Sequence, residues 1–205
     1  MIDPLITYQK WTLLFDLMVE NDCKVIVDLG ISKGRTEQAI KDLLVINNYS
    51  IDKFYGVDSF NDPLCTNGAQ YFAASTGELA SLLAWPVFTF INKTTDDALI
   101  DIPENVDMVF VDASHVPDQM SKDIKNYSEK LKDGGVLIGH DYGLFINTDY
   151  GDYGDITRFI DSYIGKDNIN IIQDTRLESN KPNFLWWTYI YRNKDGKIEY
   201  HKERK

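Results

Sequence analysis

Ionisable residues stand at the ends of two apolar segments of this sequence. Asp112 ends the run VDMVFVD, and His115 follows it by three positions. Asp141 ends the run GVLIGHD, directly after His140. Buried parallel strands that carry ionisable groups at their carboxyl ends build the active sites of open α/β sheets. We therefore predict an enzyme whose reacting groups include these side chains at one edge of a sheet.

The segments that must position these residues alternate between two hydrophobic patterns. Apolar runs rich in β-branched residues predict buried parallel strands, and apolar residues at helical spacing predict helices. The predicted strands are 23–30, 53–60, 86–92, 106–112, 135–141, 168–174 and 184–192, and the predicted helices are 5–20, 34–46, 77–85, 117–132 and 155–165. This alternation predicts one three-layer α/β domain over residues 1–205, with residues 1–22 as an N-terminal helical extension. The last two strands have no room for a helix between them, so we expect antiparallel neighbours.

Glycine-rich and aromatic segments predict how the elements are connected. The pair Gly134-Gly135 is expected to end the helix 117–132 in a tight turn. The polar, glycine- and tyrosine-rich segment 142–154 predicts a loop that covers the substrate as a lid. Its aromatic residues could stack on a sugar or an aromatic ring, and they are Tyr142, Phe145, Tyr150 and Tyr153.

Composition and charge narrow the set of partners. The chain has 205 residues, 43% of them hydrophobic, and a net charge of −11. Phosphate binding needs a basic face, so we expect no nucleic acid as a general partner. Cys23 and Cys65 form neither a metal-thiolate spacing nor a disulfide framework, which indicates a cytoplasmic protein. We expect no signal peptide and no membrane span, and a homo-oligomer remains open.

The segment VIVDLGISKGRT predicts a nucleoside site. Gly30 suits the sharp turn after a strand, and Gly34 suits close packing where a helix begins. Ser32 and Arg35 replace two glycines of the dinucleotide fingerprint, which favours a nucleoside ligand without a pyrophosphate. Asp58, near the end of the second predicted strand, could accept hydrogen bonds from both ribose hydroxyls, or it could cap the following loop.

These residues resemble class I S-adenosylmethionine-dependent methyltransferases over residues 23–192. The family's first motif, an acidic residue followed by G-x-x-x-G, matches Asp28, Gly30 and Gly34, and its ribose-binding acidic residue matches Asp58. The resemblance implies S-adenosyl-L-methionine as the cofactor. It also implies a doubly wound, Rossmann-like sheet of seven strands, mostly parallel with an antiparallel last strand.

The same resemblance implies an adenine site just after the third predicted strand. The matching residues are Thr94, Thr95 and Asp96, preceded by Lys93 where family members often have glycine.

The pattern D-x-S-H, followed by a helix and K-x-G-G-V-x-x-x-H-D, is similar to small-molecule and sugar O-methyltransferases, including macrolide-sugar enzymes. In several of these a divalent cation binds carboxylates at the ends of strands four and five. The match implies Asp112 and Asp141 as ligands of Mg²⁺, Asp112 as part of the catalytic machinery, and His115 as the general base. Some members have Glu-Asp where this chain has His140-Asp141, so reactions with and without a metal both stay open.

The sequence thus predicts an O-methyltransferase that acts on a hydroxyl of a small molecule, a sugar or a natural product. A cation on carboxylate oxygens can orient that hydroxyl and lower its pKa, and a histidine can remove its proton. Two alternatives stay open: a nucleotide-dependent Rossmann oxidoreductase, and a non-catalytic binding module with the methyltransferase fold.

Overall fold

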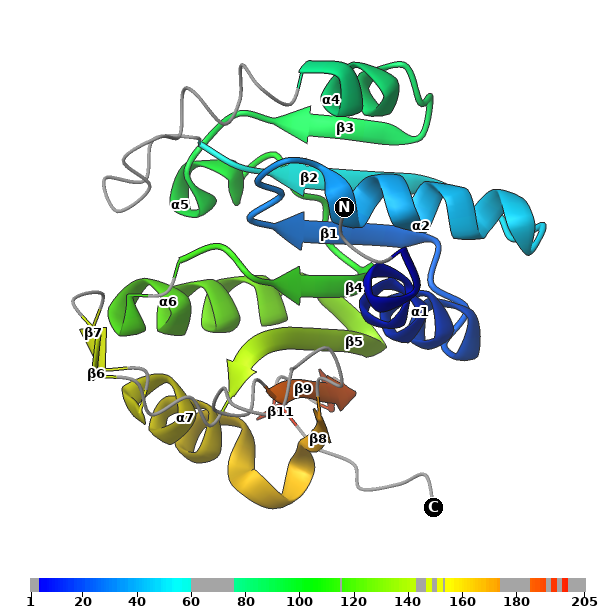
Figure 1. Cartoon of the computed structure of the whole chain (residues 1–205). Coiled ribbons are helices and arrows are strands. Elements are labelled where there is room, and N and C mark those ends of the chain that lie inside the picture. The colour runs from blue at the N-terminus through cyan, green and yellow to red at the C-terminus, as the bar shows by residue number, and fades with distance from the viewer. Residues whose placement is uncertain are drawn as a thin grey trace.

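The structure is a computed structural model of the chain (Figure 1). It describes residues 4–59, 76–114, 116–142, 147–148, 151–152, 154–173, 185–190, 193–194 and 197–198. Side chains are described for residues 12–59, 79–114, 116–139, 142 and 157–170.

A seven-stranded sheet forms the centre of the molecule, with the strand order β3-β2-β1-β4-β5-β9-β8. Its strands are β1 (Val25–Leu29), β2 (Lys53–Val57), β3 (Phe88–Ile91), β4 (Val106–Val111), β5 (Leu131–Tyr142), β8 (Asn170–Gln173) and β9 (Leu185–Ile190). The strands β1 to β5 are parallel to one another, and β9 is antiparallel to both β5 and β8. The predicted α/β architecture with a parallel sheet is confirmed.

Two short antiparallel pairs lie outside this sheet. β6 (Asn147–Thr148) pairs with β7 (Gly151–Asp152), and β10 (Asn193–Lys194) pairs with β11 (Lys197–Ile198).

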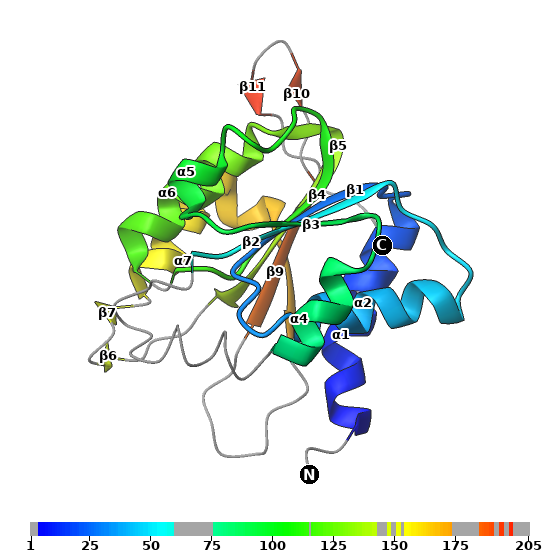
Figure 2. The same ribbon diagram turned by 90° about the horizontal axis from the view of Figure 1, so that it is seen from above.

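Helices cover both faces of the sheet (Figure 2). One face carries α1 (Pro4–Glu20), α2 (Arg35–Ile46) and α4 (Thr76–Leu83). The other carries α5 (Thr95–Ala98), α6 (Pro117–Ser128) and α7 (Gly154–Ile160), and α7 continues into a π-helical turn η1 (Asp161–Gly165) and a 3₁₀ turn η2 (Lys166–Asn168). No helix in the described parts of the chain combines the length and the apolar character that a membrane crossing requires.

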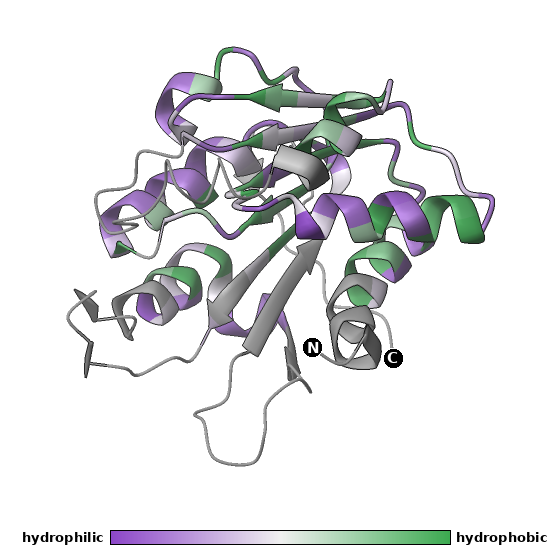
Figure 3. Cartoon of the chain, turned by 45° about the horizontal axis from the view of Figure 1, so that its top comes forward, coloured by the Kyte–Doolittle hydropathy of each residue, from purple (hydrophilic) through white to green (hydrophobic). Residues whose placement is uncertain are grey.

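Alternate residues of the central strands face two separate hydrophobic cores. In β4, Met108 and Phe110 pack in the core under α1 and α2, and Val109 and Val111 pack in the core under α6. All six residues of β4 are buried, as expected for a parallel strand covered on both faces. Figure 3 shows how this burial appears in the hydropathy of the chain. The central strands are mainly hydrophobic, whereas α2 carries both hydrophobic and hydrophilic residues.

The predicted turn at Gly134-Gly135 is wrong. The helix α6 already ends at Ser128, and β5 begins at Leu131, so both glycines lie within the strand. The pairing of β5 with β4 is irregular there, because Val106 pairs with Leu131 while Met108 pairs with Val136. Gly134 has φ +79, a conformation that glycine adopts without strain. The glycines therefore serve a bulge in β5 rather than the end of a helix.

The amino edge of the sheet is held by a buried carboxylate that the sequence did not single out. Asp107, in β4, accepts hydrogen bonds on Oδ2 from the backbone N–H groups of Lys24 at 2.7 Å and Val25 at 2.6 Å. Its Oδ1 forms an ion pair with Lys132. This cluster joins the starts of β1, β4 and β5, at the end of the sheet opposite the predicted catalytic residues.

Candidate active site

The carboxyl ends of the parallel strands meet at one edge of the sheet, on the left in Figure 1. The Gly30 N–H donates to the last carbonyl of β2 over 2.8 Å, and the Asp58 N–H donates to the last carbonyl of β3 over 3.2 Å. The Asp112 N–H donates to the last carbonyl of β1 over 3.0 Å. Three predicted site residues from distant parts of the sequence therefore lie at the ends of neighbouring strands.

The turn between β1 and α2 depends on both of its glycines. Gly30 has φ +95, and a Cβ there would lie 2.4 Å from the backbone oxygen of Asp112. Gly34 has φ +70, and its Cβ would lie 2.7 Å from Cδ1 of Leu82. The predicted sharp turn and close helix packing are both confirmed. Only a residue without a side chain lets the turn approach β4 this closely.

Asp58 lies against this turn. Its Oδ2 accepts a hydrogen bond of 2.8 Å from the backbone N–H of Ser32, which itself has φ 49. Asp58 is half-buried. A backbone donor that cannot rotate away orients this carboxylate at the edge where β1 and β2 end.

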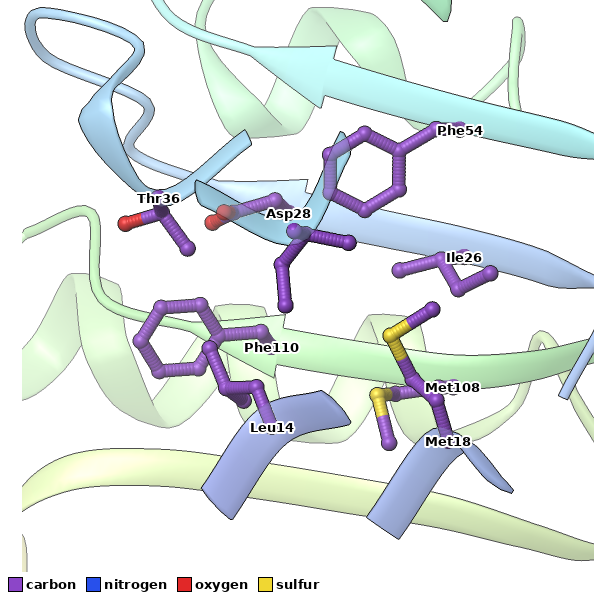
Figure 4. A pocket seen from close by; sticks show the side chains of 9 residues that line it. Leu14, Met18, Ile26, Asp28, Thr36, Phe54, Met108 and Phe110 are labelled. Carbon is purple, nitrogen blue, oxygen red and sulfur yellow. The ribbon is translucent and has the colours of Figure 1, made fainter. Parts of the chain in front are cut away.

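Asp28 lies beneath the turn rather than at its surface. The side chain is 2% exposed and lines a small pocket between the sheet and the helices α1 and α2, together with Thr36, Phe54 and Phe110 (Figure 4). The volume of this cavity is about 10 Å³, close to the space that one water molecule needs. A direct contact of Asp28 with a cofactor stays a prediction.

The residues after β3 form a short helix that the sequence analysis did not predict. Thr94 is the N-cap of α5, and its hydroxyl accepts from the Asp97 N–H over 3.2 Å. The Thr95 hydroxyl donates to Asp123 Oδ1 over 2.6 Å, and Asp96 Oδ1 accepts from Gln119 Nε2 over 3.1 Å. The predicted adenine segment is therefore attached to α6.

Asp112 directly follows β4 and is half-buried, beside the turn at Gly30. Val111 pairs with Gly139 in the parallel register of β4 and β5, so Asp112, just after β4, and Asp141, near the end of β5, belong to adjacent strands. The proposed base, His115, lies outside the described residues, as do the side chains of His140 and Asp141.

Two observations bear on the predicted metal site. Within the described part of the chain, no three His, Cys, Asp or Glu side chains lie close enough together to hold a metal ion. The pairing of β5 with β9 shifts between Gly139 and Tyr142, so the strand is irregular where it carries the predicted ligand Asp141. The metal stays a prediction.

Tyr142 is not a lid residue. Its side chain is 5% exposed, packs in the core under α6 and α7, and donates a hydrogen bond of 2.7 Å to Asp161 Oδ1. Burial raises the pKa of its phenol well above the usual range, which keeps the hydroxyl a donor. The other predicted lid residues, Phe145, Tyr150 and Tyr153, lie outside the described residues.

Three polar residues of α6 that the sequence did not single out contact the segment after β3. Gln119, Asp123 and Tyr127 are spaced by four and so share one face of the helix. The signal was available, because they stand beside the apolar positions Met120 and Ile124, where a helix that covers a sheet buries its side chains.

The sheet order, the glycine turn and the carboxylate at the end of β2 define a Rossmann-like methyltransferase fold. A family model described as "Methyltransferase domain" matches residues 27–142, more than half of the chain. The chain belongs to this family and is a class I S-adenosylmethionine-dependent methyltransferase. This assignment favours the methyltransferase over the oxidoreductase alternative.

Solved structures share the fold at low sequence identity. A Staphylococcus aureus protein provisionally described as a caffeoyl-CoA O-methyltransferase is 15% identical, with a TM-score of 0.61 over 93% of this chain and 84% of that one. The O-methyltransferase TomG of Streptomyces achromogenes, solved with S-adenosylmethionine, is 16% identical, with a TM-score of 0.58 over 89% and 79%. An rRNA methylase of Streptococcus thermophilus is 16% identical, with a TM-score of 0.56 over 86% and 93%. A comparison with curated protein sequences gave no match.

Proposed function

We propose that this methyltransferase transfers the methyl group of S-adenosylmethionine to a hydroxyl of a small molecule, a sugar or a natural product, within one domain that spans residues 1–205. The observation that supports this most directly is the hydrogen bond of Asp58 to the turn after β1, at the edge where Asp112 follows β4. In our proposal the nucleoside site and this acidic residue therefore share one edge of the sheet. That is the arrangement a methyl donor and its acceptor need.

The residues present fit the proposed cofactor. The carboxylate of Asp58 suits two neighbouring ribose hydroxyls, which are hydrogen-bond donors. Gly30 and Gly34 keep side chains out of the turn, where the methionine part would lie against the backbone. In our proposal, Thr94, Thr95 and Asp96 line the adenine end, and Asp28 supports the turn from beneath.

Methyl transfer from the sulfonium of S-adenosylmethionine needs an oxygen nucleophile in line with the methyl group. A sugar or alcohol hydroxyl is a weak nucleophile while it keeps its proton. In our proposal His115 removes that proton, a contribution of about 10²–10⁴-fold in rate for a well-placed base. Asp112 and Asp141 would hold a Mg²⁺ ion that orients the hydroxyl and lowers its pKa.

The acceptor is proposed to be a small molecule because of the charge of the chain. A net charge of −11 opposes binding of a phosphate backbone. The similarity to an rRNA methylase is a similarity of fold, and it leaves RNA as an outcome to be tested.

The test is a transfer assay with S-adenosylmethionine labelled in its methyl group. The acceptors are a panel of monosaccharides, glycosides and phenols, with total rRNA assayed in parallel. We expect the label on a small-molecule hydroxyl. Label on rRNA would replace the proposed acceptor class, and cofactor binding without any transfer would favour a non-catalytic module.

A further inference from the structure

One face of α6 holds the segment that follows β3. We call Gln119, Asp123 and Tyr127 the α6 stripe. All three contact Thr95 or Asp96 through polar atoms, although α6 and these residues are more than 20 positions apart in the chain. The stripe ends next to the loop that leads from β4 into α6, and Asp112 is in that loop.

The contacts form one connected network. Tyr127 donates its hydroxyl to the carbonyl of Thr95 over 2.7 Å, and the hydroxyl of Thr95 donates to Asp123 Oδ1 over 2.6 Å. The side-chain amide of Gln119 lies 3.2 Å from the hydroxyl of Thr95, 3.0 Å from Asp123 Oδ1 and 3.1 Å from Asp96 Oδ1. Both the backbone and the side chain of Thr95 are therefore held, and the carboxylate of Asp96 has a fixed donor.

The network runs from the core to the surface. Asp123 and Tyr127 are each 1% exposed, Gln119 and Thr95 are half-buried, and Asp96 is exposed. Polar groups buried to this degree must keep their hydrogen bonds, because each buried group left without a partner costs about 1–3 kcal/mol. Movement of Thr95 away from α6 would break several bonds together, so the inner part of the network keeps the outer part in one geometry.

We propose that Gln119, Asp123 and Tyr127 are positioning residues for cofactor binding, which hold Thr95 and Asp96 in the geometry that the adenine end of S-adenosylmethionine requires. This inference rests on the proposed function, which assigns Thr95 and Asp96 to the adenine site. In particular, Gln119 turns the carboxylate of Asp96 into an oriented acceptor, and the exocyclic amine of adenine is a donor that such an acceptor can recognise. A role in the packing of α5 on α6 alone would affect stability and leave cofactor selectivity unchanged.

The first experiment measures binding of S-adenosylhomocysteine to the full chain by calorimetry. Gln119→Leu is compared with wild type and with Lys125→Leu, which changes an exposed residue of the same helix. We expect affinity about five- to tenfold weaker for Gln119→Leu, the range of one lost hydrogen bond, and wild-type affinity for the control. Tyr127→Phe removes only the hydroxyl that holds Thr95, and we expect a loss of the same size.

The second experiment tests selectivity with S-inosylhomocysteine, in which an oxygen replaces the exocyclic amine. Wild type should bind S-adenosylhomocysteine more tightly than this analogue, and Gln119→Leu should bind the two nearly equally. Asp123→Asn keeps an acceptor oxygen for Thr95 and Gln119 and should retain both affinity and selectivity, whereas Asp123→Leu should lose both.

The outcomes separate the two proposals. If wild type binds S-adenosylhomocysteine but does not discriminate against the analogue, or if Gln119→Leu and Tyr127→Phe both keep wild-type affinity and selectivity, the positioning role is overturned. If folded wild type does not bind S-adenosylhomocysteine at all, the proposed cofactor site itself is contradicted. Circular dichroism of each variant establishes that the comparison is made between folded chains.

Discussion

At the scale of single residues, the carboxylates around the sheet occupy two kinds of environment. Asp58 lies half-buried against a backbone donor, and Asp112 lies beside the turn at Gly30. Asp107 and Asp123 are buried, at 7% and 1% exposure, and have side-chain or backbone partners within the fold. The first pair can contact a ligand, as we propose, whereas the second pair acts through partners within the protein.

Asp58→Ala should weaken binding of S-adenosylhomocysteine by about tenfold to a hundredfold. Hydrogen bonds to a charged group contribute about 1.5–3 kcal/mol, and this carboxylate would receive the ribose hydroxyls. Calorimetry measures the loss, with Asp52→Ala, an exposed acid just before β2, as the control. If the Asp58 variant and the control bind S-adenosylhomocysteine with equal affinity, the proposed contact of Asp58 with the ribose is contradicted.

The metal prediction depends on Asp112. If Mg²⁺ assists the reaction, removal of divalent cations with EDTA should lower turnover of wild type, and added Mg²⁺ should restore it. Asp112→Ala should lose both turnover and its response to Mg²⁺, whereas Asp118→Ala, at an exposed acid in the first turn of α6, should behave as wild type. Turnover that EDTA leaves unchanged would indicate a metal-free route.

Asp123 makes stability depend on pH. Burial raises the pKa of its carboxyl above the ordinary 3.8, and the negative charge of Asp96 adds to this, while Thr95, Gln119 and Lys122 act in the opposite direction. The folded state therefore binds the proton more tightly than the unfolded chain, and stability is lost as the pH rises through the raised pKa. Denaturation of wild type and Asp123→Asn should give similar free energies of unfolding below pH 3.8 and a more stable variant at pH 7. A difference that does not change with pH would contradict the raised pKa.

At the scale of elements, the two edges of the sheet have different tasks. The amino edge is joined by Asp107, which contacts the starts of β1 and β5, and the carboxyl edge carries the turns that line the candidate site. The helix α6 has two roles of its own, because its apolar residues cover β4 while the α6 stripe holds the segment after β3.

Asp107→Ala should lower the free energy of unfolding by about 2–3 kcal/mol. The substitution leaves the N–H groups of Lys24 and Val25 without their acceptor and Lys132 without its partner. Urea denaturation measures this loss. Calorimetry of the folded variant should give the wild-type affinity for S-adenosylhomocysteine, because the cluster lies at the opposite edge of the sheet. A fall in affinity would show that the two edges are not independent.

At the scale of the whole molecule, the candidate-site residues whose side chains the structure describes come from the ends of four strands. They lie between Asp28 and Asp112 in the sequence, and only the assembled sheet brings them together. A ligand that binds this edge therefore binds the folded chain and not the unfolded one.

S-adenosylhomocysteine at a hundred times its dissociation constant should stabilise the protein by about 2.7 kcal/mol. A thermal shift assay measures this, with NADH at the same concentration as the comparison. We expect no shift with NADH, because Ser32 and Arg35 stand where a pyrophosphate site needs glycine. A thermal shift with NADH and none with S-adenosylhomocysteine would instead support the oxidoreductase alternative.

The sequence by itself determined the alternation of strands and helices, the turn at Gly30 and Gly34, and the placement of Asp58 and Asp112 at strand ends. These follow from local patterns, since hydrophobic period and glycine conformation act within a few residues. Only the tertiary structure decided that Gly134 lies in a bulge, that Tyr142 is a core residue, and that α6 holds Thr95 and Asp96. Each of these depends on a partner distant in sequence, whether a paired strand, the carboxylate of Asp161 or a facing helix, and no local pattern contains that partner.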